Sequence, residues 1–374
     1  MRTLKSDHRM QGLTLVELLI ALTLGLIVIA ALVAVFMGSN RNFRQNEALA
    51  TVQDNARFAL DALSRDLAMA GYWGGVRAID AGINVRVSAI AAAAVTKASA
   101  IGDCGPATQA AADHWLFDVG TPLVFRNHTL GTATISNDFR CLLPANIQPD
   151  TDVLMIRRVS AVDALPPIGL GLAANRFYVK TNRNIASLFR ATSATFDPTG
   201  PLDCPDSTGL STACKPTEAT PTQQVYAYTP QIYYIRKWLR VAPSPEKPNG
   251  DGLPILCRRY LNDTDTTLDY PAMVEDCLAE GVENLQIEWG ISNDGSTVEN
   301  YVSDPTIDQL LLARTARIHI LVRSTNKGVQ ASNDTKTYTL ADLGNPTPWT
   351  PPADNPPGPV LRRAFITTVQ LKNL

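Results

Sequence analysis

One carboxylate inside an apolar run is the residue of this sequence with the clearest chemical demand. From Leu13 to Met37 nearly every residue is strongly apolar, and Glu17 stands one turn into that run. An ionised side chain in an apolar helix costs about 2.5 to 3.5 kcal/mol on insertion scales, so it needs a cationic partner or access to water. Glu17 therefore either extends to a membrane surface or pairs with a cation, and both readings stay open on physics alone.

The cysteines are the second candidate group, and all six lie beyond the apolar run. An even number in an exported domain predicts disulfides, and of the many available pairings the one that joins sequence neighbours is our expectation. It links Cys104 with Cys141, Cys204 with Cys214, and Cys257 with Cys277. No C-x-x-C spacing occurs and the chain has only four histidines, so a zinc site is not expected.

The sequence gives no sign of an enzyme or a resident cofactor. It has no P-loop, H-E-x-x-H or G-x-S-x-G motif, and His114, His128 and His319 have no evident nucleophile partner. We expect His319 to be a surface or packing residue. Residues 169–174 formally match G-x-G-x-x-A, but they follow two prolines rather than a strand, which argues against a nucleotide site.

Calcium is the one metal left open. Oxygen ligands are available in two places, but neither has the spacing of an EF-hand loop, so turn and surface roles are favoured. The candidate residues are Asp263, Asp265 and Asp269, and the pair Asn293 and Asp294.

Composition excludes two further classes. The chain is 45% hydrophobic with a formal net charge of −2, which is unlike a disordered protein. It lacks the basic balance expected of a protein whose main partner is nucleic acid.

The apolar run is long enough to cross a membrane. At about 1.5 Å per residue a helix from Leu13 to Met37 measures about 37 Å, against about 30 Å for the hydrocarbon core. The run exceeds the roughly 7 to 15 residues of a signal peptide, so removal by signal peptidase is not expected. A basic leader precedes it and favours a cytoplasmic N-terminus with an exported C-terminal part, whereas Arg41 and Arg44 beyond the run oppose that orientation.

The residues around Glu17 carry a family resemblance. The string from Gly12 to Ala21, GLTLVELLIA, resembles the N-terminal signature of type IV pilins and pseudopilins. The resemblance implies that a prepilin peptidase removes residues 1–12 by cutting between Gly12 and Leu13, and that the new amine is N-methylated. It also implies that Glu17 neutralises the terminal amine of a neighbouring subunit, which would hold two helices in register.

The helical pattern continues beyond the membrane. From residue 47 to residue 70 apolar residues recur every three or four positions, which predicts an amphipathic helix with Asp54, Arg57, Asp61, Arg65 and Asp66 on its polar side. Gly71 is expected to end it. Residues 13–70 thus resemble the spine helix of a pilin.

Strand patterns dominate the second half of the remaining chain. Alternating apolar and polar residues over 285–291 and 316–323 predict half-buried antiparallel strands, and further strands are expected at 153–156, 177–180, 225–228, 232–235 and 365–371. Proline-rich segments at 198–221 and 345–359 are predicted to be surface loops. The expected fold class is α+β, with a long N-terminal helix packed on an antiparallel β-sheet head formed by residues 71–374, as one domain or two subdomains.

Residues 54–72, 280–290, 317–323 and 362–365 also resemble the PilW family of pilus assembly proteins, which are minor pilins. This resemblance implies a processed, single-pass inner-membrane protein with a periplasmic head. Its implied partners are other minor pilins and the pilus assembly machinery, and its implied destination is a priming complex or the pilus tip at the cell surface. The alternatives are a type II secretion pseudopilin of the GspJ class and, from another class, a membrane-anchored periplasmic enzyme or an adhesin or receptor.

Overall fold

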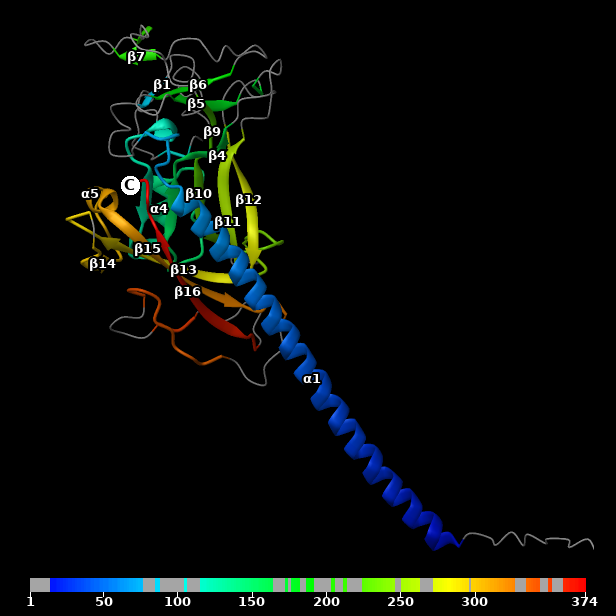
Figure 1. The fold of residues 1–374 in the computed structure, drawn as a ribbon. Helices are drawn as coiled ribbons and strands as arrows, with labels where there is room; N and C mark the ends of the chain where they lie inside the picture. The colour runs from blue at the N-terminus through cyan, green and yellow to red at the C-terminus, as the bar shows by residue number, and fades with distance from the viewer. Residues whose placement is uncertain are drawn as a thin grey trace, which may run out of the picture.

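The structure is a computed structural model of the full chain. It describes residues 14–76, 85–87, 104–105, 115–163, 172–173, 176–181, 186–191, 203–205, 211–213, 224–245, 250–262, 272–295, 297–326, 334–343, 349–351 and 359–374. The elements below belong to these residues. Figure 1 shows a head from which one long helix projects.

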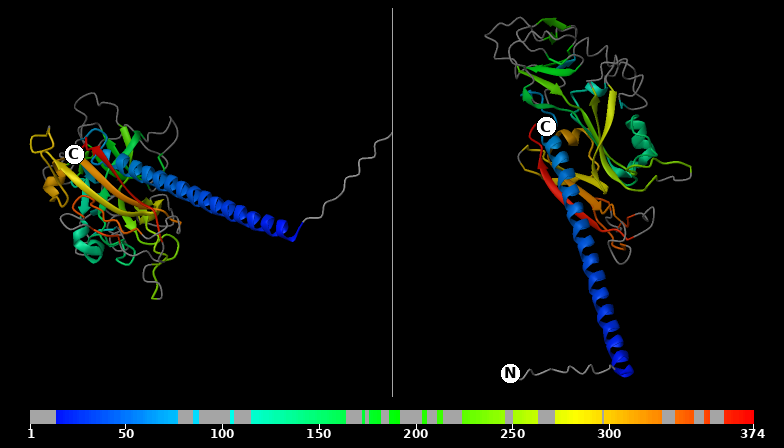
Figure 2. Two further views of the ribbon diagram at one scale, coloured as in Figure 1. Left: turned by 90° about the horizontal axis from the view of Figure 1, so that it is seen from below. Right: turned by 90° about the vertical axis from the view of Figure 1, so that its right-hand side faces the viewer.

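The long helix α1 is continuous from Leu15 to Ala68. It begins at the N-cap Thr14 and ends at Met69, after which Gly71 adopts a positive φ of 72°. Because the first buried residue of α1 is Ala48, the N-terminal part of the helix stands clear of the head (Figures 1 and 2). The prediction of one unbroken helix, apolar first and amphipathic later, is confirmed.

The head contains three larger β-sheets and one strand pair. The β5 sheet has the order β1 (Val85–Val87), β6 (Ala186–Arg190), β5 (Phe177–Thr181), β9 (Gln224–Tyr228) and β4 (Val159–Asp163). The β10 sheet has the order β12 (Ala272–Glu280), β11 (Ile255–Asn262), β10 (Gln231–Arg236), β3 (Val153–Ile156) and β2 (Leu123–Arg126). The β13 sheet has the order β14 (Asn300–Val302), β13 (Val282–Ile291), β15 (Ala313–Arg323) and β16 (Arg362–Gln370), and β7 (Asp203–Pro205) pairs with β8 (Ser211–Ala213).

The remaining elements are short helices. Two 3-10 turns cover Trp115–Phe117 and His128–Leu130, and two α-helices, α4 and α5, cover Gly131–Asp138 and Ile307–Leu311. Among the described pairs only β1 and β6 run parallel. The predicted α+β class with an antiparallel head is therefore confirmed, and each strand expected from the sequence lies on a strand of the structure.

Two cores meet at the β10 sheet. The first lies between α1, one face of this sheet and the β13 sheet, and it includes Leu63, Tyr233 and Trp289. The second lies on the opposite face of the β10 sheet, toward the β5 sheet, and includes Tyr234 and Tyr228. Because successive side chains of a strand point to opposite faces, β10 supplies both cores and is buried along its whole length.

The prediction of half-buried strands holds over only part of the β13 sheet: in β15, buried and half-buried residues alternate from Ala316 to Ile320. In β13 the polar residues Asn284 and Gln286 are buried too, and they donate hydrogen bonds of 2.8 and 2.9 Å to the carbonyl of Asp150. In β15 the alternation fails at Leu321, which packs against Leu340 and Leu343. Residues that are distant in sequence form these contacts, so the local alternation could not predict them.

Two of the three expected disulfides are present in the structure. They join Cys104 to Cys141 and Cys257 to Cys277. The third expected pair involves Cys214, which lies outside the described residues. Within the segment 198–221, predicted as a loop, the structure places the short β7–β8 pair.

Candidate functional site

The first turn of α1 carries the carboxylate that the sequence singled out. Thr14 is the N-cap, and its side chain accepts a hydrogen bond of 3.3 Å from the backbone N–H of Glu17. In return, Oε2 of Glu17 accepts hydrogen bonds of 2.9 Å from both the backbone N–H and the hydroxyl of Thr14. This reciprocal arrangement is a capping box, which satisfies donors that a helix start leaves free.

The capping box leaves half of the carboxylate available. Both hydrogen bonds end on Oε2, and within the described residues Oε1 of Glu17 accepts none. Glu17 can thus cap its own helix and receive a cation from outside the chain at the same time. Gly12 and Leu13, the predicted cleavage site, lie outside the described residues. Sequence reasoning overlooked Thr14 as the cap, although the spacing Thr-x-x-Glu is a known start signal.

The side chains that follow Glu17 form a continuous apolar surface. The large apolar side chains between Leu15 and Met37 are exposed by 50% at Val33 to 76% at Leu15. The most apolar window of the helix has a mean hydropathy of 3.1 and no residue buried against the head. By length and composition α1 is able to cross a membrane, and an apolar surface of this extent requires a nonaqueous or protein partner.

A buried charge fastens the other end of α1 to the head. Asp66 accepts hydrogen bonds from the guanidinium of Arg158, at 3.1 Å from Nε, and from the hydroxyl of Tyr233 at 2.5 Å. Burial and the charge of Asp66 raise the pKa of Tyr233, so the phenol stays a donor. The prediction that Asp66 lies on the polar side of the helix is wrong, whereas Asp54, Arg57, Asp61 and Arg65 are exposed as predicted.

Two amides join the same junction to backbone carbonyls. Asn55 on α1 donates to the carbonyl of Glu280 at 2.9 Å, and Asn373 near the C-terminus donates to the carbonyl of Ala68 at 3.1 Å. With the apolar contacts of α1 to β12, β13, β15 and β16, these bonds hold the C-terminal half of the helix in a fixed position on the head. These contacts set the orientation of the helix relative to the head at this junction.

A histidine and an aspartate form a buried titratable pair within the head. Nδ1 of His128 lies 3.6 Å from Oδ1 of Asp152 and 3.9 Å from Oδ1 of Asp342. Burial raises the pKa of Asp152 to about 6, although backbone N–H donors at Ile287 and His128 act against it. Burial also disfavours charge on His128, but its contact with Asp152 and the charges of Asp342 and Asp150 outweigh this and raise its pKa.

The described residues around the histidines offer no catalytic arrangement. His128 faces carboxylates, and His319 contacts Glu288 at 3.0 Å. Neither ring is hydrogen bonded to a serine or cysteine in the described part of the head. His114 lies outside the described residues, as do Asp263, Asp265 and Asp269.

The metal candidates among the described residues take part in other contacts. One group with ligand-type side chains, Cys257, Glu275 and Cys277, contains two cysteines that are bonded to each other and so are not free thiolate ligands. At the other candidate, Asp294 accepts hydrogen bonds from Ser292 and Thr297, and Asn293 donates to Glu299 at 2.7 Å. These contacts fit the turn role that the sequence favoured.

Comparison with known families matches both ends of the chain. Residues 245–373 match the family model of type IV pilus-assembly protein W, and residues 7–33 match the prokaryotic N-terminal methylation motif, a stretch that includes Gly12, Leu13 and Glu17. No curated protein and no solved structure matches the chain. The two family matches confirm the resemblance found in the sequence: the chain is PilW-like over residues 245–373 and carries the prokaryotic N-terminal methylation motif.

Proposed function

We propose that this chain is a minor pilin that takes part in starting type IV pilus assembly. In this proposal a prepilin peptidase cuts between Gly12 and Leu13, residues 13–37 hold the protein in the inner membrane, and the head stays in the periplasm. The processed protein then joins other minor pilins in a complex that primes the pilus or sits at its tip. The family match over residues 245–373 supports a role in the pilus.

The observation that carries the proposal is the half-occupied carboxylate of Glu17 at the start of an exposed apolar helix. Removal of residues 1–12 would leave a cationic amine on Leu13, next to Thr14. An amine and a carboxylate that are each costly in lipid become tolerable as a pair. Because Oε2 is already used within the chain, Oε1 is the atom that fits the amine of a neighbouring subunit.

Glu17→Ala tests this pairing. We expect the leader to be removed almost as in the wild type, since the cleavage site is unchanged, while the amount of assembled pilus falls strongly. Pilus yield by shearing and immunoblotting measures assembly, and the shift of the protein band measures processing. Glu47→Ala is the matched control, because Glu47 is an exposed carboxylate of the same helix outside the apolar run. Normal piliation with Glu17→Ala would sink the pairing argument.

Gly12→Val tests the cleavage site. A branched side chain at the cut should leave the chain at full length and in the membrane, with no assembly. A band that still shortens would show that cleavage occurs elsewhere.

The same spine would also suit a secretion pseudopilin. The match to a pilus-assembly family favours the pilus. A strain that lacks this protein distinguishes the pilus role from the secretion role, because the proposal expects the strain to lose its pili and to keep secretion.

A further inference from the structure

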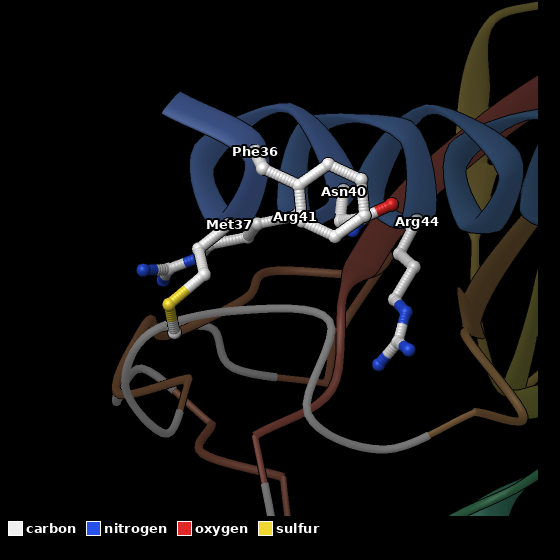
Figure 3. A pocket seen from close by; sticks show the side chains of 5 residues that line it. All are labelled: Phe36, Met37, Asn40, Arg41 and Arg44. Atoms are coloured by element: carbon white, nitrogen blue, oxygen red, sulfur yellow. The ribbon is translucent and has the colours of Figure 1, made fainter. Parts of the chain in front are cut away.

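A pocket with an apolar part and a cationic part lies where the apolar run of α1 ends, before the helix reaches the head. Phe36, Met37, Asn40, Arg41 and Arg44 line it, and Figure 3 shows their side chains extending from one side of the helix. At about 100° per residue these five positions span an arc of about 140°. Side chains of different chemistry thus share one face.

The order of these side chains along the helix follows the chemistry of a phospholipid. The apolar pair Phe36 and Met37 lies nearest the apolar segment, the amide of Asn40 comes one turn later, and the guanidinium groups of Arg41 and Arg44 follow. From Phe36 to Arg44 the rise is about 12 Å. A lipid presents acyl chain, ester carbonyls and phosphate in the same order.

The position of the pocket along the helix agrees with the thickness of a bilayer. From Thr14 the helix rises about 40 Å to Arg41 and about 45 Å to Arg44. A bilayer including its headgroups is about 40 to 45 Å thick. Since the first buried contact of α1 with the head is at Ala48, both arginines lie between the membrane segment and the head.

The two arginines are available to an anion. Both are exposed, and in the described part of the chain neither forms an ion pair. Two such positive charges next to the exported end of a span attract an anion at the membrane surface. We propose that Arg41 and Arg44 bind the phosphate of an anionic phospholipid in the leaflet next to the head, with Phe36 and Met37 against its acyl chains. This inference rests on the proposed function for the placement of α1 across the membrane.

The bound lipid gives the subunit a fixed depth before assembly. Guanidinium groups recognise phosphate through parallel N–H donors, and two of them at positions i and i+3 face one headgroup. Lifting the helix out of the membrane would break these contacts. The lipid contacts therefore oppose extraction of the subunit from the membrane, and subunit pairing through Glu17 must overcome them.

The test uses the full-length protein in nanodiscs made of phosphatidylcholine with a minor fraction of phosphatidylglycerol. Native mass spectrometry counts the lipids of each type that stay bound after release. We expect the wild type to retain phosphatidylglycerol in preference, and R41Q/R44Q to lose about fivefold of that preference for each arginine removed. Added salt should weaken the wild-type preference as well.

The matched control is R57Q/R65Q, which removes two exposed arginines of the same helix beside the head. It should keep the wild-type preference, and thermal melting of both variants should match the wild type because all four side chains are exposed. A wild type without preference, or R41Q/R44Q that retains it, would overturn the inference. The same variant can be crosslinked to other pilins. If R41Q/R44Q keeps its lipid preference but no longer crosslinks to another pilin, the inference is overturned and the arginines are assigned to a protein partner.

Failure of this inference is separable from failure of the proposed function. A chain that is cut after Gly12 and assembles, yet shows no lipid preference, overturns the lipid site alone. A chain that prefers phosphatidylglycerol but is not cut overturns the pilin role alone.

Discussion

Asp66 lies in the buried stripe of α1 although its charge marks it as a surface residue. It follows Leu63 by three positions, so helical spacing places it beside the core, but a carboxylate there is acceptable only with partners. Its partners Arg158 and Tyr233 are 92 and 167 residues away in sequence. Local patterns contain no information about such distant pairing, which is why Asp66 was predicted to lie on the polar side of the helix.

Asp66→Asn should destabilise the junction of helix and head. The change leaves the half-buried charge of Arg158 without its counter-ion, and loss of one partner of a buried pair costs about 3 to 5 kcal/mol. Urea unfolding of the full chain in detergent micelles measures the difference. Asp61→Asn is the control, because the exposed pair of Asp61 and Arg65 is worth less than about 1 kcal/mol. Equal effects of the two changes would contradict the role given to Asp66.

His128 and Asp152 make stability depend on pH. Both have raised pKa values in the folded state, Asp152 from 3.8 to about 6, so the folded protein binds more protons than the unfolded one. Stability is therefore expected to fall through Asp152 as pH rises from about 4 to about 6, and to fall further through His128 above its ordinary pKa of 6.5. Unfolding free energies across this range measure the trend.

In Asp152→Asn the unfolding free energy should depend less on pH between about 4 and about 6, because an amide does not titrate in this range. His319→Gln is the comparison, since its imidazole contacts Glu288 in another part of the head. An unfolding free energy of the wild type that rises with pH over the same range would contradict the prediction.

At the scale of elements, one glycine turns the chain from the β10 sheet into the β13 sheet. Gly281 separates β12 from β13 with a φ of 77°, and its N–H and carbonyl bond to Pro254 and Arg323. A Cβ at this position would lie 2.3 Å from the carbonyl oxygen of Arg323. The turn thus requires both a positive φ and the absence of a side chain.

Gly281→Ala should cost about 3 kcal/mol or more, because backbone strain and a backbone clash add together. Gly131→Ala isolates the first effect, since Gly131 has a φ of 71° but open space around its Cβ, and it should cost about 1 to 2 kcal/mol. Thermal melting of both variants makes the comparison. Equal losses of stability in the two variants would contradict the prediction, because they would show that the backbone clash at Gly281 adds nothing.

Elements were predictable where a residue's neighbours in sequence decide its state. The long apolar run and the 3.6-residue period after it identify the two parts of α1, and the alternation in β13 and β15 identifies them as strands. Their packing was not predictable, because Asn284 and Gln286 are buried through bonds to Asp150, a residue of a distant loop. The division of the strands among three sheets depends on such contacts too.

At the scale of the whole molecule, the chain is a head with a projecting helix, and the two parts of that helix suit an apolar environment and the surface of the head. As far as Met37 the projecting part of α1 is apolar on nearly all sides, residues 38–47 are mostly polar, and the part beyond Ala48 is amphipathic and packs on the head (Figures 1 and 2). The buried junction at Asp66 and the free oxygen of Glu17 lie at opposite ends of this helix. A pull on the N-terminal end is therefore transmitted to the head through one rigid element.

The intact mass of the native protein tests the central claim most directly. The account predicts a chain that begins at Leu13, carries one added methyl group at its amine, and has its paired cysteines oxidised. Comparison of reduced and unreduced samples gives the number of disulfides in the same experiment. A mass that retains residues 1–12, or that places the cut anywhere other than after Gly12, would contradict the account.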